Sequence, residues 1–228
     1  MTTLSPSDLA GLIDHTLLRP DATTDDVSLL CDEALEFGFA TVCVNPIYVR
    51  QCADHLSNSG VGVITVAGFP LGASSTAEKV AAVQHSLGDG AVEFDMVMNI
   101  GAFKNGDISS VVTDIKAVVS AAESNRVKVI IEACLLNDDE KVTAAKAVVD
   151  AGAHFVKTST GFSMGGATMK DVRLLRKTLS DDFGVKASGG IKGFGHALSL
   201  VDAGANRIGA SASVAIVTDT RRTVASDY

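Results

Sequence analysis

Two lysines of this sequence stand inside apolar runs, where an ammonium group is costly to bury. Lys157 lies in "AHFVKTSTGF" and Lys186 lies in "GVKASGG". Strand alternation places Phe155, Lys157 and Ser159 on one face, so Lys157 points into a nearly dry interior or into a layer between strands and helices. A lysine in either place must be paired with an acidic side chain, be neutral, or take part in a reaction.

Two interpretations of Lys157 are open. A structural ion pair with Glu132 or Asp95 would account for this lysine by itself. Lys186 on a neighbouring strand favours a reactive role, because two close ammonium groups depress each other's pKa and a neutral amine can attack a carbonyl. The lysine pair therefore predicts catalysis through a Schiff base.

Glycines and a serine downstream predict an anion site. Gly189 and Gly190 in "ASGGIKGFG" and Ser211 in "NRIGAS" each follow an apolar run with strand character. Each could be only a tight turn. Together, however, they resemble the phosphate sites that barrels build after their last two strands, where backbone N–H groups and helix N-termini meet.

These residues need a scaffold, and the chain alternates short β-rich runs with longer amphipathic ones. The expected strands lie near residues 13–18, 40–45, 61–68, 91–99, 127–133, 153–159, 184–189 and 206–211. Capping residues mark the helices between them, such as Ser75 with Glu78, and Asn137. Gly38, Gly90, Gly152 and Gly204 recur where a helix runs into a strand.

Eight such pairs predict a closed (β/α)₈ TIM barrel, an α/β fold, with an open doubly wound sheet as the alternative. One domain is expected to span residues 1–228, with a short mobile tail from about residue 223. In a barrel, reactive groups belong at the C-terminal ends of the strands. The polar candidates there are Asp14, His15, Cys43, Asn45, Asp95, Asn99, Glu132, Lys157, Lys186 and Ser211.

Metal chemistry is not expected, because the five histidines are scattered and only His15 falls near the C-terminal end of a strand. We expect His15 to be a hydrogen-bonded residue beneath the active mouth. His55 and His85 are expected at solvated helix positions. Cys43 is expected to line the pocket as a packing residue, with a Cys–His nucleophile as a minor alternative.

Composition excludes several classes of partner. Of 228 residues, 27 are acidic and 19 are Lys or Arg, and the net charge of −8 argues against nucleic-acid or anionic-membrane binding. Four cysteines without a C-x-x-C pair indicate neither a disulfide framework nor a thiolate zinc site. With no secretory signal and no apolar run of membrane-spanning length, we expect a cytoplasmic protein.

The ordered motifs resemble the deoxyribose-phosphate aldolases, a Schiff-base-forming (class I) family. The resemblance covers nearly the whole chain through "IDHTLLRPDAT", "TVCVNP", "GFPLG", "EFDMVMNIG", "VKVIIEACLL", "FVKTSTGF", "VKASGGI" and "RIGAS". It implies a (β/α)₈ barrel that reversibly cleaves 2-deoxyribose 5-phosphate to acetaldehyde and glyceraldehyde 3-phosphate in deoxyribose phosphate catabolism. It also implies that no metal or other cofactor is needed.

The resemblance assigns roles by position. It implies that Lys157 forms the Schiff base, that Lys186 perturbs Lys157, and that Asp95 transfers protons. The terminal Tyr228 is implied to reach the pocket and help move a proton. The implied substrate-binding residues are Asp14, Cys43, Thr160, Gly189, Gly190 and Ser211. "GASAS" departs from members with two consecutive serines, because Ala212 takes the second place.

Other functions remain open at this point. A phosphosugar isomerase, or another Schiff-base aldolase such as a transaldolase, would share the barrel and the phosphate site. A non-catalytic barrel could bind a phosphorylated metabolite with Lys157 as its counter-ion. The sequence leaves a homodimer open as the assembly.

Overall fold

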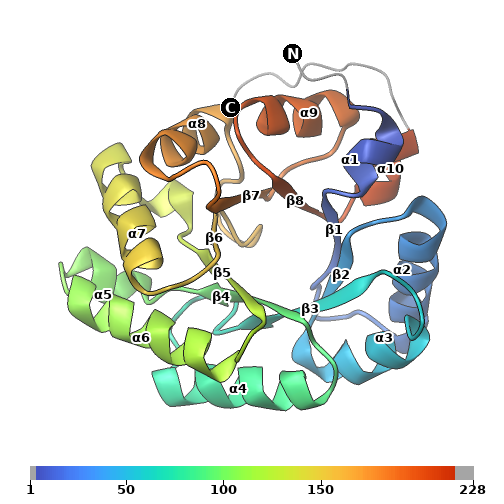
Figure 1. Ribbon diagram of the computed structural model, residues 1–228, viewed down its shortest axis with the longest axis horizontal. Coiled ribbons are helices and arrows are strands. Elements are labelled where there is room, and N and C mark those ends of the chain that lie inside the picture. The colour runs from blue at the N-terminus through green and yellow to red at the C-terminus, as the bar shows by residue number, and fades with distance from the viewer. Residues whose placement is uncertain (1–3, 219–228) are drawn as a thin grey trace.

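The computed structural model describes residues 4–218 and contains the eight expected strands. They are parallel, pair in sequence order and close into a barrel by pairing of β8 with β1 (Figure 1). The strands are β1 (Ile13–Leu17), β2 (Thr41–Val44), β3 (Gly62–Ala67), β4 (Glu93–Val97), β5 (Arg126–Ile130), β6 (Phe155–Lys157), β7 (Gly184–Ser188) and β8 (Arg207–Ala210). This closed topology confirms the (β/α)₈ prediction and excludes the open sheet.

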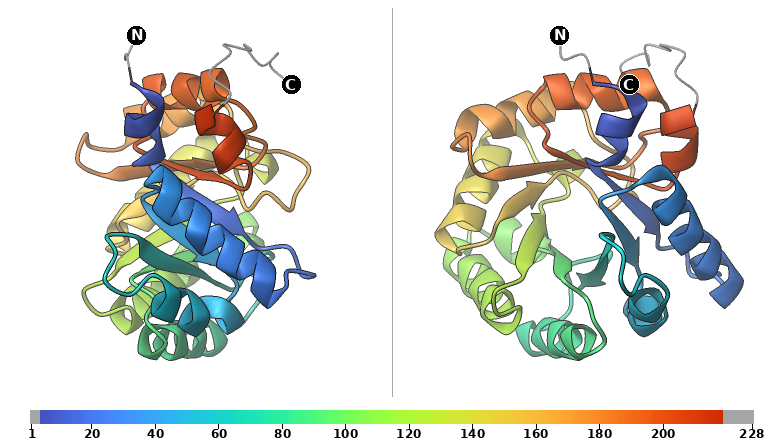
Figure 2. Two further views of the ribbon diagram at one scale, coloured as in Figure 1. Left: turned by 90° about the vertical axis from the view of Figure 1, so that its right-hand side faces the viewer. Right: turned by 45° about the vertical axis from the view of Figure 1, so that its right-hand side comes forward.

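Helices surround the barrel, with α1 beside α10 where the ring of helices closes (Figure 2). The α-helices are α1 (Pro6–Ala10), α2 (Thr24–Phe37), α3 (Val49–His55), α4 (Thr76–Gly88), α5 (Ile100–Lys104), α6 (Ile108–Ala121), α7 (Asp138–Asp150), α8 (Met169–Thr178), α9 (Phe194–Asp202) and α10 (Ser213–Thr218). Two short 3₁₀ helices, η1 (Pro46–Tyr48) and η2 (Ala133–Leu135), follow β2 and β5.

Side-chain caps begin the helices where the sequence predicts them. The hydroxyl of Ser75 accepts a hydrogen bond from the backbone N–H of Glu78, whose carboxylate accepts one from the N–H of Ser75. Asn137 and Glu140 form the same reciprocal cap at α7. Both predicted caps are confirmed.

The main apolar core lies between the strands and the helices. On β7, Val185 and Ala187 face outward into this core, and Lys186 between them faces the barrel interior. On β4, Phe94 and Met96 face outward in the same way. The inward positions between them are polar on β4 and β7, whereas β2 and β3 contribute Cys43, Ile64 and Val66 to a separate small apolar cluster.

The barrel interior is charged, whereas bulky aliphatic residues dominate most barrel interiors. Its carboxylates, Asp14, Glu93 and Asp95, come from β1 and β4. Its cations come from the second half of the barrel, on β5, β6, β7 and β8. They are Lys128, Lys157, Lys186 and Arg207.

Candidate active site

Lys157 stands at the end of β6 and faces a cavity of about 520 Å³ at the C-terminal mouth of the barrel. Its side chain is 4% exposed, and its Nζ lies 2.7 Å from Oδ2 of Asp95. Its carboxylate partner is therefore Asp95. The carboxylate of Glu132 instead accepts hydrogen bonds from the backbone N–H and the hydroxyl of Thr160, with 2.5 Å between the hydroxyl and Oε2.

Asp95 links the two predicted lysines through one oxygen. Its Oδ2 lies 2.7 Å from Nζ of Lys157 and 2.6 Å from Nζ of Lys186. Burial alone would raise the pKa of Asp95, but Lys128, Lys157 and Lys186 hold it well below its usual range. The carboxylate is consequently ionised, and it joins β4, β6 and β7 behind Lys157, outside the residues that line the cavity.

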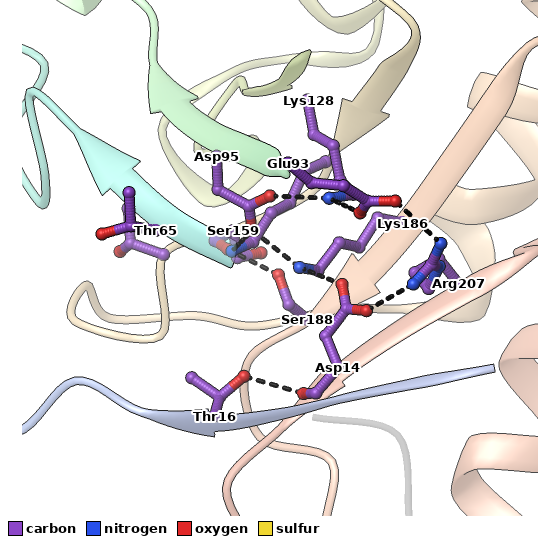
Figure 3. Close-up of polar contacts among 12 residues, drawn as sticks. Asp14, Thr16, Thr65, Glu93, Asp95, Lys128, Ser159, Lys186, Ser188 and Arg207 are labelled. Atoms are coloured by element: carbon purple, nitrogen blue, oxygen red, sulfur yellow. Dashed lines mark hydrogen bonds and ion pairs between the residues drawn. The ribbon is translucent and has the colours of Figure 1, made fainter. Parts of the chain in front are cut away.

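Lys186 is completely buried and lies between two carboxylates (Figure 3). Its Nζ is 2.5 Å from Oδ2 of Asp14 and 2.6 Å from Oδ2 of Asp95. Burial would lower the pKa of Lys186, but the two carboxylates raise it above its usual value. The expectation that the lysines depress each other is therefore wrong for Lys186, because Asp14 and Asp95 outweigh the neighbouring ammonium.

Lys157 behaves in the opposite way. Burial lowers its pKa most, Asp95 opposes that shift, and Lys186 adds to it. The perturbing effect expected of Lys186 is present, although burial is the larger cause. An amine that loses its proton more easily than an ordinary lysine thus faces the cavity beside a lysine that keeps its proton.

The number of charges inside the barrel also indicates that Lys157 gives up its proton more easily than Lys186. Four side chains that are at most 12% exposed, Lys128, Lys157, Lys186 and Arg207, are cationic when protonated. They share three carboxylates, one of which, Glu93, also pairs with the exposed guanidinium of Arg126, so full protonation leaves at least one positive charge in excess. Of the four, Lys157 is the one that lines the cavity. It is therefore the group best placed to release its proton.

The part of the cavity next to Lys157 that follows β7 and β8 is built largely from backbone and small side chains. Gly189, Gly190 and Ser211 line it, as predicted, together with Thr160. Gly189 and Gly190 have φ of +88° and +73°, a left-handed conformation that favours glycine. Gly166 packs against Gly189 so closely that the Ala167 N–H donates to the Gly189 carbonyl over 3.1 Å. This end could accommodate an anion through backbone N–H groups and the Ser211 hydroxyl.

Asp14 and Cys43 are buried in the barrel interior, outside the residues that line the cavity. Asp14 also accepts hydrogen bonds from Thr41 and Arg207, each over 2.7 Å. Lys186, Lys128 and Arg207 overcome the effect of burial and lower the pKa of Asp14 to about 2. Cys43 packs with Leu18, Ile64 and Val66. Burial, reinforced by Asp95, raises the pKa of its thiol to about 11, which disfavours a thiolate nucleophile.

His15 lies on the other face of β1 and does not meet Cys43. Its Nε2 is 2.6 Å from Oε2 of Glu33 on α2, and its ring contacts Phe39. The expected hydrogen bond of His15 is confirmed, but its expected place beneath the active mouth is wrong, because the strand alternation that turns Asp14 inward turns His15 outward. Asn45 and Asn99 are structural: Asn45 donates to the Leu18 carbonyl and Asn99 caps α5. The two helical histidines are both exposed, as expected: His55 pairs with Asp32, and His85 lies 3.3 Å from Asp89.

Three charged residues that the sequence analysis missed lie deeper in the barrel, namely Glu93, Lys128 and Arg207. Glu93 and Arg207 begin their strands and Lys128 is the third residue of β5, so all three lie away from the C-terminal strand ends where a barrel places its reactive groups. The signal was present as alternation, because Glu93 and Asp95 are two residues apart on one strand.

Within residues 4–218, no group of three or more His, Cys, Asp or Glu side chains is arranged to hold a metal ion. The four cysteines are free thiols. Over the same residues, no helix has the length and apolar character to cross a membrane. Tyr228 and the predicted tail lie outside the described residues.

Comparison with known proteins gives one consistent family. The model of the DeoC/LacD family of aldolases matches residues 9–216. A deoxyribose-phosphate aldolase of Exiguobacterium sibiricum is 55% identical over 96% of this chain and 99% of its own, and one of Brevibacillus brevis is 52% identical over 92% and 96%. The tetrameric deoxyribose phosphate aldolase structure from Aeropyrum pernix superposes with a TM-score of 0.90 at 36% identity, covering 96% of this chain and 94% of that one.

Proposed function

This chain belongs to the DeoC/LacD family of aldolases, and from that membership we propose that Lys157 is the residue through which it reversibly cleaves 2-deoxyribose 5-phosphate to acetaldehyde and glyceraldehyde 3-phosphate. The reaction is that of a class I aldolase, a carbon–carbon lyase. One observation carries the assignment: among the four interior cations, Lys157 alone faces the cavity, with a lowered pKa.

The chemistry follows from an amine in that position. Neutral Nζ of Lys157 attacks C1 of the open-chain sugar, and loss of water from the adduct leaves an iminium. The C3 hydroxyl then loses its proton, the C2–C3 bond breaks, and its electron pair moves into an enamine on Lys157. Glyceraldehyde 3-phosphate leaves, C2 takes up a proton, and water hydrolyses the iminium to release acetaldehyde.

Asp95 supports this sequence by its charge and its position. Its ionised carboxylate lies beside Nζ of Lys157, so it stabilises the positive iminium formed on that atom. We assign it, with Lys186, to proton transfer through a water between the network and the sugar. Asp14 acts on the substrate only through Lys186, which it holds at 2.5 Å. Cys43, which was expected to line the pocket, is instead a packing residue of the barrel interior outside the cavity lining.

The phosphate is assigned to the side of the cavity after β7 and β8. Backbone N–H groups of Gly189 and Gly190 and the hydroxyl of Ser211 are the proposed donors. Thr160 shapes this end, because its hydroxyl donates to Glu132 and accepts from the Phe162 N–H. Ala212 also lines the cavity, so the second hydroxyl found in some members is replaced by a methyl group.

Trapping of the Schiff base tests the assignment. Borohydride added with acetaldehyde or deoxyribose 5-phosphate should reduce the imine and leave a covalent label on Lys157, located by mass spectrometry. Lys157→Ala should abolish both label and turnover. The matched control is Lys192→Ala, which removes another lysine that lines the cavity and should keep the label. A label on Lys186 would reverse the assigned roles.

Trapping together with product analysis separates the alternatives. A non-catalytic barrel with Lys157 as a counter-ion forms no imine and gives no label. A transaldolase or an isomerase would be revealed by products other than acetaldehyde and glyceraldehyde 3-phosphate.

Tyr228 is assigned to protonation of the enamine carbon. Tyr228→Phe should slow the exchange of acetaldehyde methyl protons with solvent deuterium while label formation at Lys157 continues. An unchanged exchange rate, both in this variant and in one without the last residue, would remove Tyr228 from the mechanism.

A homodimer in the cytoplasm is the setting we propose for this enzyme. Four free cysteines suit a reducing compartment. Sedimentation analysis would distinguish a dimer from the tetramer described for the Aeropyrum pernix relative.

A further inference from the structure

Three charged side chains lie beneath Asp95, toward the N-terminal end of the barrel, and we call Glu93, Lys128 and Arg207 the lower cluster (Figure 3). Lys128 is fully buried, contacts Oε2 of Glu93, and places its Nζ 3.2 Å from Oδ1 of Asp95. Arg207 bridges two carboxylates, 2.7 Å from Oδ1 of Asp14 and 3.3 Å from Oε1 of Glu93. The exposed guanidinium of Arg126, at the start of β5, lies 3.1 Å from the same Oε1 of Glu93.

Both routes through the lower cluster end at the same carboxylate. Lys128 lies on the Oδ1 side of Asp95, which leaves Oδ2 to Lys157 and Lys186. Arg207 holds one oxygen of Asp14 while Lys186 holds the other, and Lys186 in turn contacts Asp95. The orientation of the Asp95 carboxylate is therefore determined from below as well as from the cavity.

None of these three residues lines the active cavity, so they do not touch the substrate. We propose that Glu93, Lys128 and Arg207 are positioning residues for the reaction, which orient Asp95 and set the net charge felt by Nζ of Lys157. This inference rests on the proposed role of Lys157 as the Schiff-base residue.

The direction in which the lower cluster shifts the pKa of Lys157 follows from the charged groups around that lysine. Asp95 on β4, Lys186 on β7 and the Cys43 thiol on β2 act on it directly. Asp95 is in turn faced by Lys128 and Lys186, and Asp14 is faced by Lys186, Lys128 and Arg207. Removing a negative charge from the lower cluster disfavours the Lys157 ammonium, and removing a positive charge favours it.

The test is the pH dependence of kcat/KM, whose acid limb reports the protonation of the free enzyme. Glu93→Gln should move the acid limb to lower pH, and Lys128→Met should move it to higher pH, each by about half a pH unit or more. Lys128→Arg, which retains the charge, should keep the wild-type position even if turnover is slower. Arg207→Met should shift the limb in the same direction as Lys128→Met and serves as a second variant if Lys128→Met does not fold.

A matched control comes from a buried ion pair outside the barrel. Lys141 on α7 lies 2.6 Å from Asp171 on α8, so Asp171→Asn should lower stability and leave the pH profile in place. Shifts of the same sign in Glu93→Gln and Lys128→Met, or none in either, would overturn the proposal. Borohydride trapping at Lys157 in each variant shows whether the Schiff-base function persists, so the two inferences can fail separately.

Discussion

At the scale of single residues, the site depends on a contrast between two lysines that share a carboxylate. Lys186 has two carboxylates and keeps its proton, whereas Lys157 has one and is buried beside a cation. Simple proximity of two lysines would not distinguish them. Asp14 makes the difference, since it contacts Lys186 and not Lys157.

Replacing Lys186 should make Lys157 harder to deprotonate. Lys186→Leu removes a cation and leaves Oδ2 of Asp95 entirely to Lys157, so the pKa of Lys157 should rise. Imine formation would then require a higher pH, measurable as an upward shift of the acid limb of trapping with acetaldehyde. A profile that coincides with that of the wild type would exclude Lys186 as the perturbing residue.

Removing the hydroxyl of Ser211 should affect phosphorylated and plain substrates differently. Ser211→Ala should lower kcat/KM for 2-deoxyribose 5-phosphate by a factor that corresponds to roughly 1 kcal/mol or more of lost transition-state stabilisation. This is the scale of a hydrogen bond to a charged oxygen. Unphosphorylated deoxyribose is the control and should lose much less. Equal losses with both substrates would take Ser211 out of the phosphate site.

At the scale of elements, the loop between β6 and α8 forms one wall of the cavity through contact of two glycines. An alanine Cβ at Gly166 would lie 2.2 Å from the Gly189 carbonyl oxygen, within backbone rather than a movable side chain. Gly190 is a useful comparison, because a Cβ there meets nothing within 4 Å, although its φ is +73°.

Gly166→Ala should therefore be the more damaging change. We expect it to lower the free energy of unfolding by roughly 2 to 3 kcal/mol through overpacking. Gly190→Ala should cost about 1 kcal/mol from its left-handed backbone. Urea denaturation of both variants would measure the difference, and the reverse order would show that the loop adapts independently of Gly189.

Sequence patterns predicted the elements better than their polar contacts. Alternation and capping residues located all eight strands and the starts of α4 and α7 because these signals are local. The partner of Lys157 was left between Asp95 and Glu132, since the choice depends on the barrel register that brings β4, β6 and β7 together. Arg207 was missed because it begins β8, away from the C-terminal strand ends, and its partner Asp14 is 193 residues away.

At the scale of the whole molecule, the interior carboxylates link stability to pH. Asp14 has a pKa of about 2 in the folded protein and an ordinary value near 3.8 when unfolded. Its stabilising contribution is complete above the unfolded value and is lost as the pH falls from about 4 toward 2.

Acid denaturation should reveal this contribution. Between pH 5 and pH 3, the wild type should lose about 1 kcal/mol through Asp14. Asp14→Asn should be less stable than the wild type at pH 5, but it should not show this pH-dependent loss. The free energies of unfolding of the two proteins, measured with urea, should therefore converge as the pH falls. Parallel stability curves would mean that Asp14 titrates normally.

Treatment with a chelator tests whether the enzyme acts without a metal ion. Exhaustive treatment with a chelator should leave deoxyribose-phosphate cleavage intact, because the chemistry is assigned to lysine and carboxylate groups. Activity lost to the chelator and restored by zinc would contradict this mechanism.

The division of interior charge between the two halves of the barrel has a consequence for assembly. The carboxylates of β1 and β4 and the cations of β5 to β8 are hydrated while the halves are apart, and they neutralise each other only on closure. The lysine chemistry therefore exists only after the barrel has closed, because the ion pairs of the active centre join β1 and β4 to β5–β8.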